Sequence, residues 1–336
     1  MSAVDISDFL RQNKQSLASS AAERYFDRHP DFRAWKSGVE HTLEDKVYTL
    51  EFLASSIEVH SIEAFAGYVR WLRTVLDSRG LDSAMISESL ADIGEVLKEF
   101  PEVFAAAMPY LADARSWLSL APGTESGSGL KDRQSAYLQA ALSANRRAAM
   151  TVVEHSLQTS EPALVYADVV APAMHEVGRL WQTNQITVAR EHMATATTQY
   201  VLAEVYSQQS PSGPRRGKAV VSGMQGEFHQ LGAHMVADVL DFDGWDVRFL
   251  GTNMPHDGIV AAIEEHEATV VGLSATMLLS VPKLAALISD IKRRLPSIRI
   301  LVGGSLVVNR YIDPVSLGAD ASATSLLEGR ELARGW

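Results

Sequence analysis

The sequence predicts a multidomain α and α/β protein. Its first two segments are expected to be helical, and its last segment is expected to form a doubly wound parallel sheet. Three observations support this fold class. Apolar residues recur at three- and four-residue steps up to about residue 206, and β-branched runs alternate with amphipathic helices after residue 218. Stretches rich in Gly, Ser and Pro at 121–129 and 207–217 read as linkers. They divide the chain into domains 1–120, 130–206 and 218–336.

The first two segments are predicted to be helical throughout. In the first, apolar stripes indicate helices over about 43–57, 62–76, 86–97 and 102–120. The second predicts a helical bundle with helices over about 130–158, 163–184 and 187–208. No alternating strand pattern occurs in the first segment, so we expect an all-helical domain there.

The last segment changes character. Short runs rich in Val and Ile predict strands at 219–222, 246–250, 269–274 and 298–302. Between them, amphipathic patterns predict helices at about 230–243, 256–267 and 281–295. Strands separated by helices form βαβ units and a parallel sheet, whose ligands bind at the carboxyl ends of the strands.

Composition excludes several classes of protein. The net charge of −11 disfavours sequence-independent binding of nucleic acid, which needs basic patches. Cysteine is absent, which excludes disulfides, thiolate metal sites, cysteine nucleophiles and a thioether-linked chromophore. The first residues lack the pattern of a signal peptide, and no apolar stretch is long enough to span a membrane. We therefore expect a cytoplasmic protein with no membrane partner.

Polar and glycine residues follow three of the predicted strands. They are Glu227-Phe-His229-Gln230-Leu231-Gly232, Ser274-Ala-Thr276 and Gly303-Gly304. Because the strands are parallel, these residues are expected to meet at one rim of the sheet. A neutral imidazole at His229 can bind a metal through one nitrogen and donate its other N–H to a carboxylate such as Glu227. The glycines leave a backbone groove free of side chains, and Ser274 adds a hydroxyl to it.

The spacing of these residues resembles the cobalamin-binding domains of the methionine-synthase type. Those carry DxHxxG, about 41 residues, SxL, about 26–28 residues, and GG. Here 41 residues separate Gly232 from Ser274 and 26 separate Thr276 from Gly303, while Glu227 and Thr276 replace the Asp and Leu. The resemblance implies a flavodoxin-like fold and His229 as the lower ligand of the cobalt. It also implies that the cofactor's displaced nucleotide tail passes Ser274 and Gly303-Gly304.

The middle segment resembles the four-helix-bundle cap of B12-dependent photoreceptors. Trp181 is followed after nine residues by Glu191-His192, with Val188 between them. In that family the Trp and Val pack on the upper adenosyl group and the Glu binds its ribose, which implies adenosylcobalamin. The family's light-responsive repressors have a His directly after the Trp, but this chain has Gln182. The upper ligand after illumination is therefore left open between water and a histidine such as His175 or His192.

The N-terminal segment resembles globin-like sensor domains, and the whole architecture resembles the photocobilins, which join a B12 domain to a biliverdin domain. The resemblance implies a non-covalent bilin, held by polar, basic and aromatic side chains. The candidate contacts are His41, Asp45, Tyr48, His60, Tyr68, Arg70, Trp71 and Arg73.

The function implied by these resemblances is that of a non-enzymatic light sensor. Light would cleave the cobalt–carbon bond of adenosylcobalamin and change cap packing, homo-oligomer state or contacts with a signalling partner. Two alternatives remain. One is a corrinoid methyl carrier that works with separate methyltransferases. The other is a haem-binding or ligandless globin-like stress sensor, with His41 or His60 at the haem. A mutase is disfavoured because the chain has no room for a barrel of about 250 residues.

Overall fold

The computed structural model describes residues 1–34, 36–119, 130–209 and 215–336. The chain forms two compact units, Met1–Glu125 and Ser126–Trp336, each of which is considered by itself. The predicted linker at 121–129 lies outside the described residues, as do residues 210–214 of the second one.

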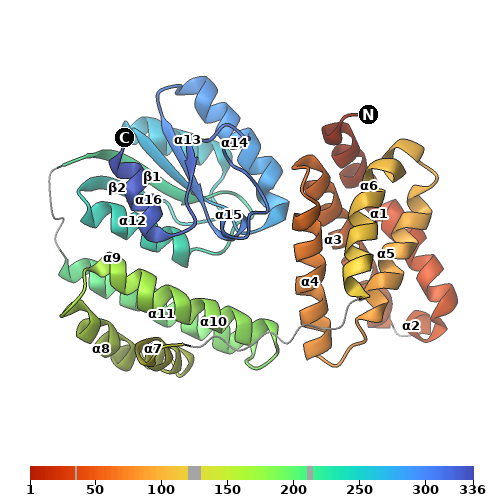
Figure 1. Ribbon diagram of the computed structural model, residues 1–336, viewed down its shortest axis with the longest axis horizontal. Helices are drawn as coiled ribbons and strands as arrows, with labels where there is room; N and C mark the ends of the chain where they lie inside the picture. The colour runs from red at the N-terminus through yellow and green to blue at the C-terminus, as the bar shows by residue number, and fades with distance from the viewer. Residues whose placement is uncertain (35, 120–129, 210–214) are drawn as a thin grey trace. The chain divides into compact units, whose positions relative to one another are not determined.

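The first unit is all helical, as predicted (Figure 1). Helix α1 contacts α3 and α5, and α6 contacts α4 and α5, around a core that includes Leu10, Leu53 and Phe65. Its helices are α1 (Ala3–Arg28), α2 (Pro30–Ala34), α3 (Lys36–Glu58), α4 (Ile62–Ser78), α5 (Ala84–Leu97) and α6 (Pro101–Leu118).

The second unit begins with the predicted helical bundle. Its elements are α7 (Asp132–Leu142), α8 (Arg146–Leu157), α9 (Pro162–Val165), the π-helix η1 (Tyr166–Val170), α10 (Ala171–Gln182) and α11 (Val188–Gln208). The single helix predicted over 130–158 is wrong, because the chain turns between α7 and α8. Ala144 adopts a positive φ of 52°, and the Asn145 side chain accepts a hydrogen bond from the N–H of Ala148. Asn145 therefore caps a new helix.

A five-stranded parallel sheet follows, in the order β2-β1-β3-β4-β5. This is the flavodoxin-like order, so the predicted doubly wound sheet is confirmed. The strands are β1 (Gly217–Gly223), β2 (Trp245–Phe249), β3 (Val270–Ser274), β4 (Arg299–Gly303) and β5 (Ala321–Ser322). The helices are α12 (Leu231–Phe242), α13 (His256–His266), α14 (Val281–Arg294), α15 (Ser305–Val308) and α16 (Leu326–Arg334), with the 3₁₀ turn η2 (Leu278–Ser280). The two-residue β5, α15 and α16 were not predicted.

The second unit is built in layers. Helices α13 and α14 cover one face of the sheet, while α12 and α16 cover the other (Figure 1). The bundle packs beneath α12 and α16 through α9 and α11. Met235 and Val239 of α12 belong to the same buried apolar cluster as the bundle. The helix that follows the predicted ligand loop is therefore also the helix on which the bundle rests.

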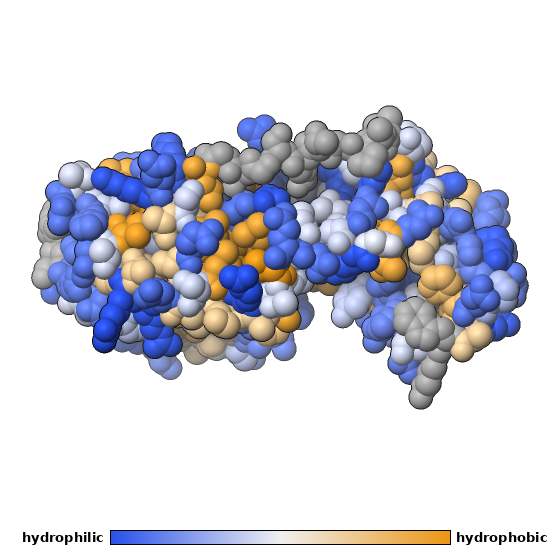
Figure 2. Space-filling model, turned by 90° about the horizontal axis from the view of Figure 1, so that it is seen from below, coloured by the Kyte–Doolittle hydropathy of each residue, from blue (hydrophilic) through white to orange (hydrophobic). Residues whose placement is uncertain are grey.

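The surface of this bundle is mixed in polarity. Figure 2 views the molecule from the bundle side and shows patches of hydrophobic residues among hydrophilic ones. Exposed large apolar residues of α11 are Val188, Met193, Tyr200 and Tyr206. None of the helices in the described ranges combines the length and apolarity needed to cross a membrane.

Candidate functional site

The carboxyl ends of three neighbouring strands place the predicted residues in one row. In the registers of the parallel pairs, Gly223 of β1 lies opposite Ser274 of β3, and Ser274 lies opposite Gly303 of β4. Among the described residues, the Ser274 hydroxyl makes no hydrogen bond, although the side chain is only 9% exposed. The row therefore presents one uncommitted hydroxyl between two glycines, as expected from the sequence.

Glu227 and His229 form the polar centre of this rim. His229 Nδ1 lies 2.7 Å from Glu227 Oε1, which also accepts the backbone N–H of His229 at 2.9 Å. Glu227 Oε2 accepts the backbone N–H of Thr276 at 2.6 Å. The fully buried carboxylate thus joins the loop after β1 to the loop after β3.

The hydrogen bond between Glu227 and His229 shifts the pKa of both groups and fixes the tautomer of the neutral imidazole. Burial opposes the charge of Glu227, but the hydrogen bonds from His229 and Thr276 outweigh it, so the pKa of this carboxyl is lowered. The hydrogen bond to Glu227 raises the pKa of His229 in spite of burial, and the nearby Glu191 carboxylate adds to this. Because a carboxylate only accepts, Nδ1 carries the proton and Nε2 of the neutral imidazole keeps its lone pair. The side chain of His229 is 61% exposed, so that lone pair is accessible to a metal.

Glycines keep side chains away from the rim. Gly304 has a φ of 102°, and a Cβ there would lie 2.4 Å from the carbonyl oxygen of Ala275. A Cβ at Gly303 would make only an ordinary contact at 3.5 Å, and one at Gly232 would meet nothing within 4 Å. Gly304 is therefore required by the fold, whereas Gly303 and Gly232 leave open space. Gln230 caps α12 and Leu231 begins it, directly behind the His229 loop.

One residue that was not predicted holds the His229 loop in place. Asn253, in the loop after β2, has a φ of 56° and accepts the backbone N–H of Gly226 at 3.0 Å. Asn tolerates this left-handed conformation better than most residues. Its position in the Gly-Thr-Asn-Met-Pro run after the second predicted strand was the signal that could have identified it.

The bundle brings the predicted residue Glu191 near the rim at the start of α11. Glu191 is close enough to raise the pKa of His229, and its Oε1 accepts the Thr195 hydroxyl at 3.0 Å. Its other oxygen lies 2.7 Å from Nδ1 of the exposed His192. Val188, which begins α11, is 56% exposed.

The end of α10 carries the remaining residues predicted in the bundle. Trp181 and Gln182 occupy the last two positions of that helix, and both are partly buried. Trp181 packs against the buried core of the bundle. His175 is exposed two turns earlier on α10.

The residues predicted to hold a bilin lie on α3, on α4 and in the turn between them. Tyr68 is buried, stacks on Phe52 with ring centroids 4.0 Å apart, and its hydroxyl is 3.1 Å from Thr49 Oγ1. The ring of Trp71 continues this stack at 6.4 Å from Tyr68. Two of the predicted basic residues, Arg70 and the buried Arg73, lie over the ring of Trp117.

The other candidates of this set are exposed. His41, Asp45 and Tyr48 lie on α3, and His60 lies in the turn after it with a φ of 53°. The structure therefore stacks Tyr68 with Trp71 and places Arg70 and Arg73 beside Trp117, whereas Tyr48 and the two histidines are exposed.

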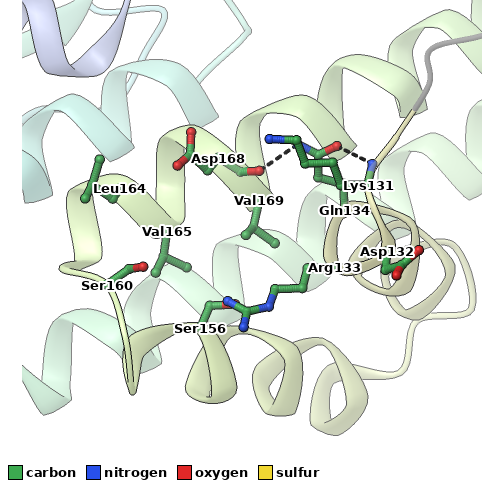
Figure 3. Close-up of a pocket in the computed structure, with 10 residues that line it drawn as sticks. All are labelled: Lys131, Asp132, Arg133, Gln134, Ser156, Ser160, Leu164, Val165, Asp168 and Val169. Atoms are coloured by element: carbon green, nitrogen blue, oxygen red, sulfur yellow. Dashed lines mark hydrogen bonds between the residues drawn. The ribbon is translucent and has the colours of Figure 1, made fainter.

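A separate cavity lies in the bundle, away from the rim. Figure 3 shows this space of about 330 Å³ between the start of α7, the end of α8 and the π-helix. Lys131, Arg133, Ser160 and Asp168 are among the residues that line it. None of the residues predicted for a site lines this cavity.

The fold and rim define a class of protein: a flavodoxin-like domain with an accessible, carboxylate-paired histidine, covered by a helical bundle. Within the described residues, no group of three or more His, Asp or Glu side chains is arranged to hold a metal ion. A corrinoid brings the other ligands of its cobalt with it, so it needs only one ligand such as His229 from the protein. The accessible imidazole, the space beside Gly232 and the uncommitted Ser274 hydroxyl fit such a group.

Comparisons with known proteins agree with this class. Residues 217–325 and residues 134–206 match two family models, each described as a B12 binding domain. The chain thus contains a two-part B12-binding module, all of it within the second compact unit.

Two known proteins and one solved structure are similar to part of this chain. Dimethylamine corrinoid protein 1 of Methanosarcina mazei is 26% identical over 195 residues, covering 56% of this chain and 89% of that protein. The HTH-type transcriptional repressor CarA of Myxococcus xanthus is 28% identical over 178 residues, covering 52% of this chain and 59% of the repressor. The structure of the Methanosarcina barkeri monomethylamine corrinoid protein shares the fold, with a TM-score of 0.50 at 20% identity over 59% of this chain and 94% of that one.

Proposed function

We propose that the protein is a corrinoid methyl carrier, which holds cobalamin for a separate methyltransferase and catalyses no reaction alone. The observation that carries this is the Glu227–His229 pair, in which Nδ1 is engaged at 2.7 Å and Nε2 of the exposed imidazole remains for a cobalt. The similarity to a dimethylamine corrinoid protein over nearly all of that protein's length supports it. This function is the alternative left open by the sequence, and the comparisons favour it over the light sensor.

In this proposal the residues of the chain bind and orient the cofactor. His229 supplies the lower ligand, and Glu227 fixes its tautomer and increases its basicity. Ser274 and the two glycines after β4 accommodate the nucleotide tail, while Trp181, Val188 and Glu191 bound the upper face. A bound corrinoid supplies a cobalt that carries a methyl group between a donor and an acceptor.

The test is an absorption spectrum of the full-length protein with methylcobalamin, adenosylcobalamin and hydroxocobalamin. We expect binding of all three in the base-off, His-on form, with comparable affinity for the methyl and adenosyl forms. A protein that binds no corrinoid contradicts the proposal. A strong preference for adenosylcobalamin contradicts the carrier and supports the second candidate below.

The second candidate is a light sensor that binds adenosylcobalamin. Two observations favour it: the spacing from Trp181 to Glu191 matches that of the photoreceptor cap, and the chain is similar to the repressor CarA. Light-dependent cleavage of the cobalt–carbon bond is the chemistry that the cofactor supplies. In this candidate, the bundle changes its packing and the protein changes its homo-oligomeric state or its contact with a signalling partner. A change of hydrodynamic size on illumination of the adenosyl form supports it, and identical elution in dark and light contradicts it.

A non-covalent biliverdin in a globin-like first unit belongs to this second candidate. The stacked rings of Phe52, Tyr68 and Trp71, with Arg70 and Arg73 beside Trp117, provide aromatic walls and charges for propionates. Titration of the full-length protein with biliverdin is expected to produce a far-red band. A haem Soret band in place of it supports the haem alternative, and no band at saturating pigment contradicts both.

A further inference from the structure

The helix that leads to Trp181 contains a π-turn. Between α9 and α10 the chain forms η1, in which the N–H of Ala171 donates to the carbonyl of Tyr166, five residues earlier. One extra residue in a helical turn rotates everything that follows by about 100°. The π-turn therefore determines the direction in which the side chain of Trp181 points from α10.

The π-turn is held on one side by Gln134. Pro172 has no N–H, so it cannot donate to the carbonyl of Asp168, its partner in a regular helix. The side-chain amide of Gln134 donates to that carbonyl instead at 2.7 Å (Figure 3). Gln134 is itself fixed, since its amide oxygen accepts the N–H of Lys131 at 2.8 Å. The missing backbone hydrogen bond is thus replaced from α7.

On the other side the π-turn is tied to the sheet domain. The buried phenol of Tyr166 donates to Asp238 Oδ2 at 3.0 Å. Asp238 is 5% exposed and lies on α12, whose first residue comes two positions after His229. His234, one turn earlier on α12, stacks on Phe249 and places its Nε2 3.7 Å from Asp238 Oδ1. A single hydrogen bond therefore connects the helix behind His229 with the helix that carries Trp181.

We propose that the Tyr166–Asp238 hydrogen bond is a positioning contact, which sets the place of Trp181 over the cofactor and thereby the preference of the site for the upper ligand of cobalamin. The inference rests on the proposed binding of cobalamin, whichever of the two candidate functions holds. Trp181 lies eleven residues beyond the last residue of the π-turn, about 16 Å along the helix, so a tilt of roughly 10° at η1 displaces it by about 3 Å. Such a shift is enough to open or close a contact with an upper ligand.

The chemistry of the pair favours a role in specificity over one in stability. Replacing a buried phenol and carboxyl together by apolar groups of similar shape often leaves stability unchanged. A hydrogen bond between them, in contrast, is formed in only one arrangement of the two helices. Apolar packing between α9, α11 and α12 is not directional, so it tolerates small rotations of these helices. The hydrogen bond from Tyr166 to Asp238 is directional and stabilises one orientation.

The experiment measures affinities of the full-length protein for adenosylcobalamin and methylcobalamin in Tyr166→Phe and Asp238→Asn. Tyr137→Phe is the matched control, because its phenol is equally buried and donates to Thr198 at 3.1 Å within the bundle. We expect Tyr166→Phe and Asp238→Asn to change the ratio of the two affinities at least 5-fold, with the His-on spectrum kept. We expect no change of ratio in Tyr137→Phe. In a Trp181→Ala background, Tyr166→Phe is expected to leave the ratio unchanged.

A second measurement does not depend on the cofactor. Hydrogen exchange of α10 amides in the free protein is expected to be at least 10-fold faster in Tyr166→Phe than in Tyr137→Phe. Equal exchange, or an affinity loss that is the same for both cobalamins, overturns the positioning role while the proposed function stands. A wild-type protein that binds no corrinoid overturns both.

Discussion

Glu227 and Thr276 are 49 residues apart in sequence, yet the buried carboxylate of one accepts the backbone N–H of the other at 2.6 Å. The same carboxylate holds both N–H groups of His229 with its other oxygen. The orientation of the imidazole is therefore determined by two loops at the carboxyl ends of β1 and β3. Substitutions around this connection test the site most directly.

His229→Ala is expected to abolish the His-on spectrum and to weaken cobalamin binding at least about 10-fold. Losing the residue that binds the metal is expected to cost at least as much affinity as losing a residue that orients it. Absorption titrations with hydroxocobalamin provide the measurement. His256→Ala is the matched control, since His256 on α13 also pairs with a carboxylate, that of Asp290 at 3.0 Å. Equal affinities in the two variants would rule out His229 as the ligand.

Glu227→Gln is expected to weaken cobalamin binding by about 10- to 100-fold, the usual cost of losing a carboxylate behind a metal-bound histidine. It is also expected to lower the free energy of unfolding by about 1–3 kcal/mol, because the charged hydrogen bonds to His229 and Thr276 are lost. Titration and chemical denaturation measure the two effects. Unchanged affinity would show that orientation of the imidazole does not depend on Glu227.

The adjacent glycines after β4 are expected to respond differently to alanine. Gly304→Ala places a Cβ 2.4 Å from a backbone oxygen at a φ of 102°, so it is expected to lower the free energy of unfolding by at least about 2 kcal/mol. Gly303→Ala meets its nearest atom at 3.5 Å and is expected to fold with near wild-type stability. If the nucleotide tail passes Gly303, this variant nevertheless binds cobalamin more weakly. Thermal unfolding that is equally impaired in both variants would contradict the prediction.

Trp181→Ala is expected to keep affinity for hydroxocobalamin within about 3-fold, because the lower-face ligands remain, and to change the ratio of the affinities for adenosylcobalamin and methylcobalamin. Titration with the adenosyl and methyl forms measures this. Trp71→Ala, an exposed tryptophan of the first unit, is the control. Should both variants discriminate like the wild type, Trp181 does not bound the upper face.

Asp238 is expected to make stability fall as the pH rises. Burial raises its pKa from 3.8 to about 7, against the opposing hydrogen bond from Tyr166. Between these values the folded protein keeps a proton that the unfolded chain has lost, so the free energy of unfolding decreases up to about pH 7 and then levels off. The total is roughly 4 kcal/mol at most. Denaturation of wild type and Asp238→Asn between pH 4 and 8 measures the difference, and parallel curves would contradict the prediction.

Asp290 offers an internal contrast for that experiment. The hydrogen bond with His256 lowers the pKa of Asp290, so its contribution to stability is lost as the pH falls. In Asp290→Asn, the difference from wild type is therefore expected to shrink toward acid pH, with the sign opposite to that of Asp238.

The sequence by itself predicted the parallel sheet, four of its five strands with the three helices between them, and the residues that follow the strands at its rim. The alternation of Val-rich strands with amphipathic helices is a local pattern that can be seen in the sequence. Because parallel strands end at the same edge of a sheet, the residues that follow Ser222, Leu273 and Val302 must lie close together. The spacing from Gly232 to Ser274 and Gly303 added the expectation of cobalamin, which the family models support.

Only the tertiary structure decided how these residues act together. The turn at Ala144, the anchoring of the His229 loop by Asn253 and the second hydrogen bond of Glu227 to Thr276 depend on backbone conformations and contacts with no periodic signature. The link from Tyr166 to Asp238 joins residues 72 positions apart. Such contacts arise because packed layers bring distant groups to hydrogen-bonding distance, where a buried polar atom must find a partner.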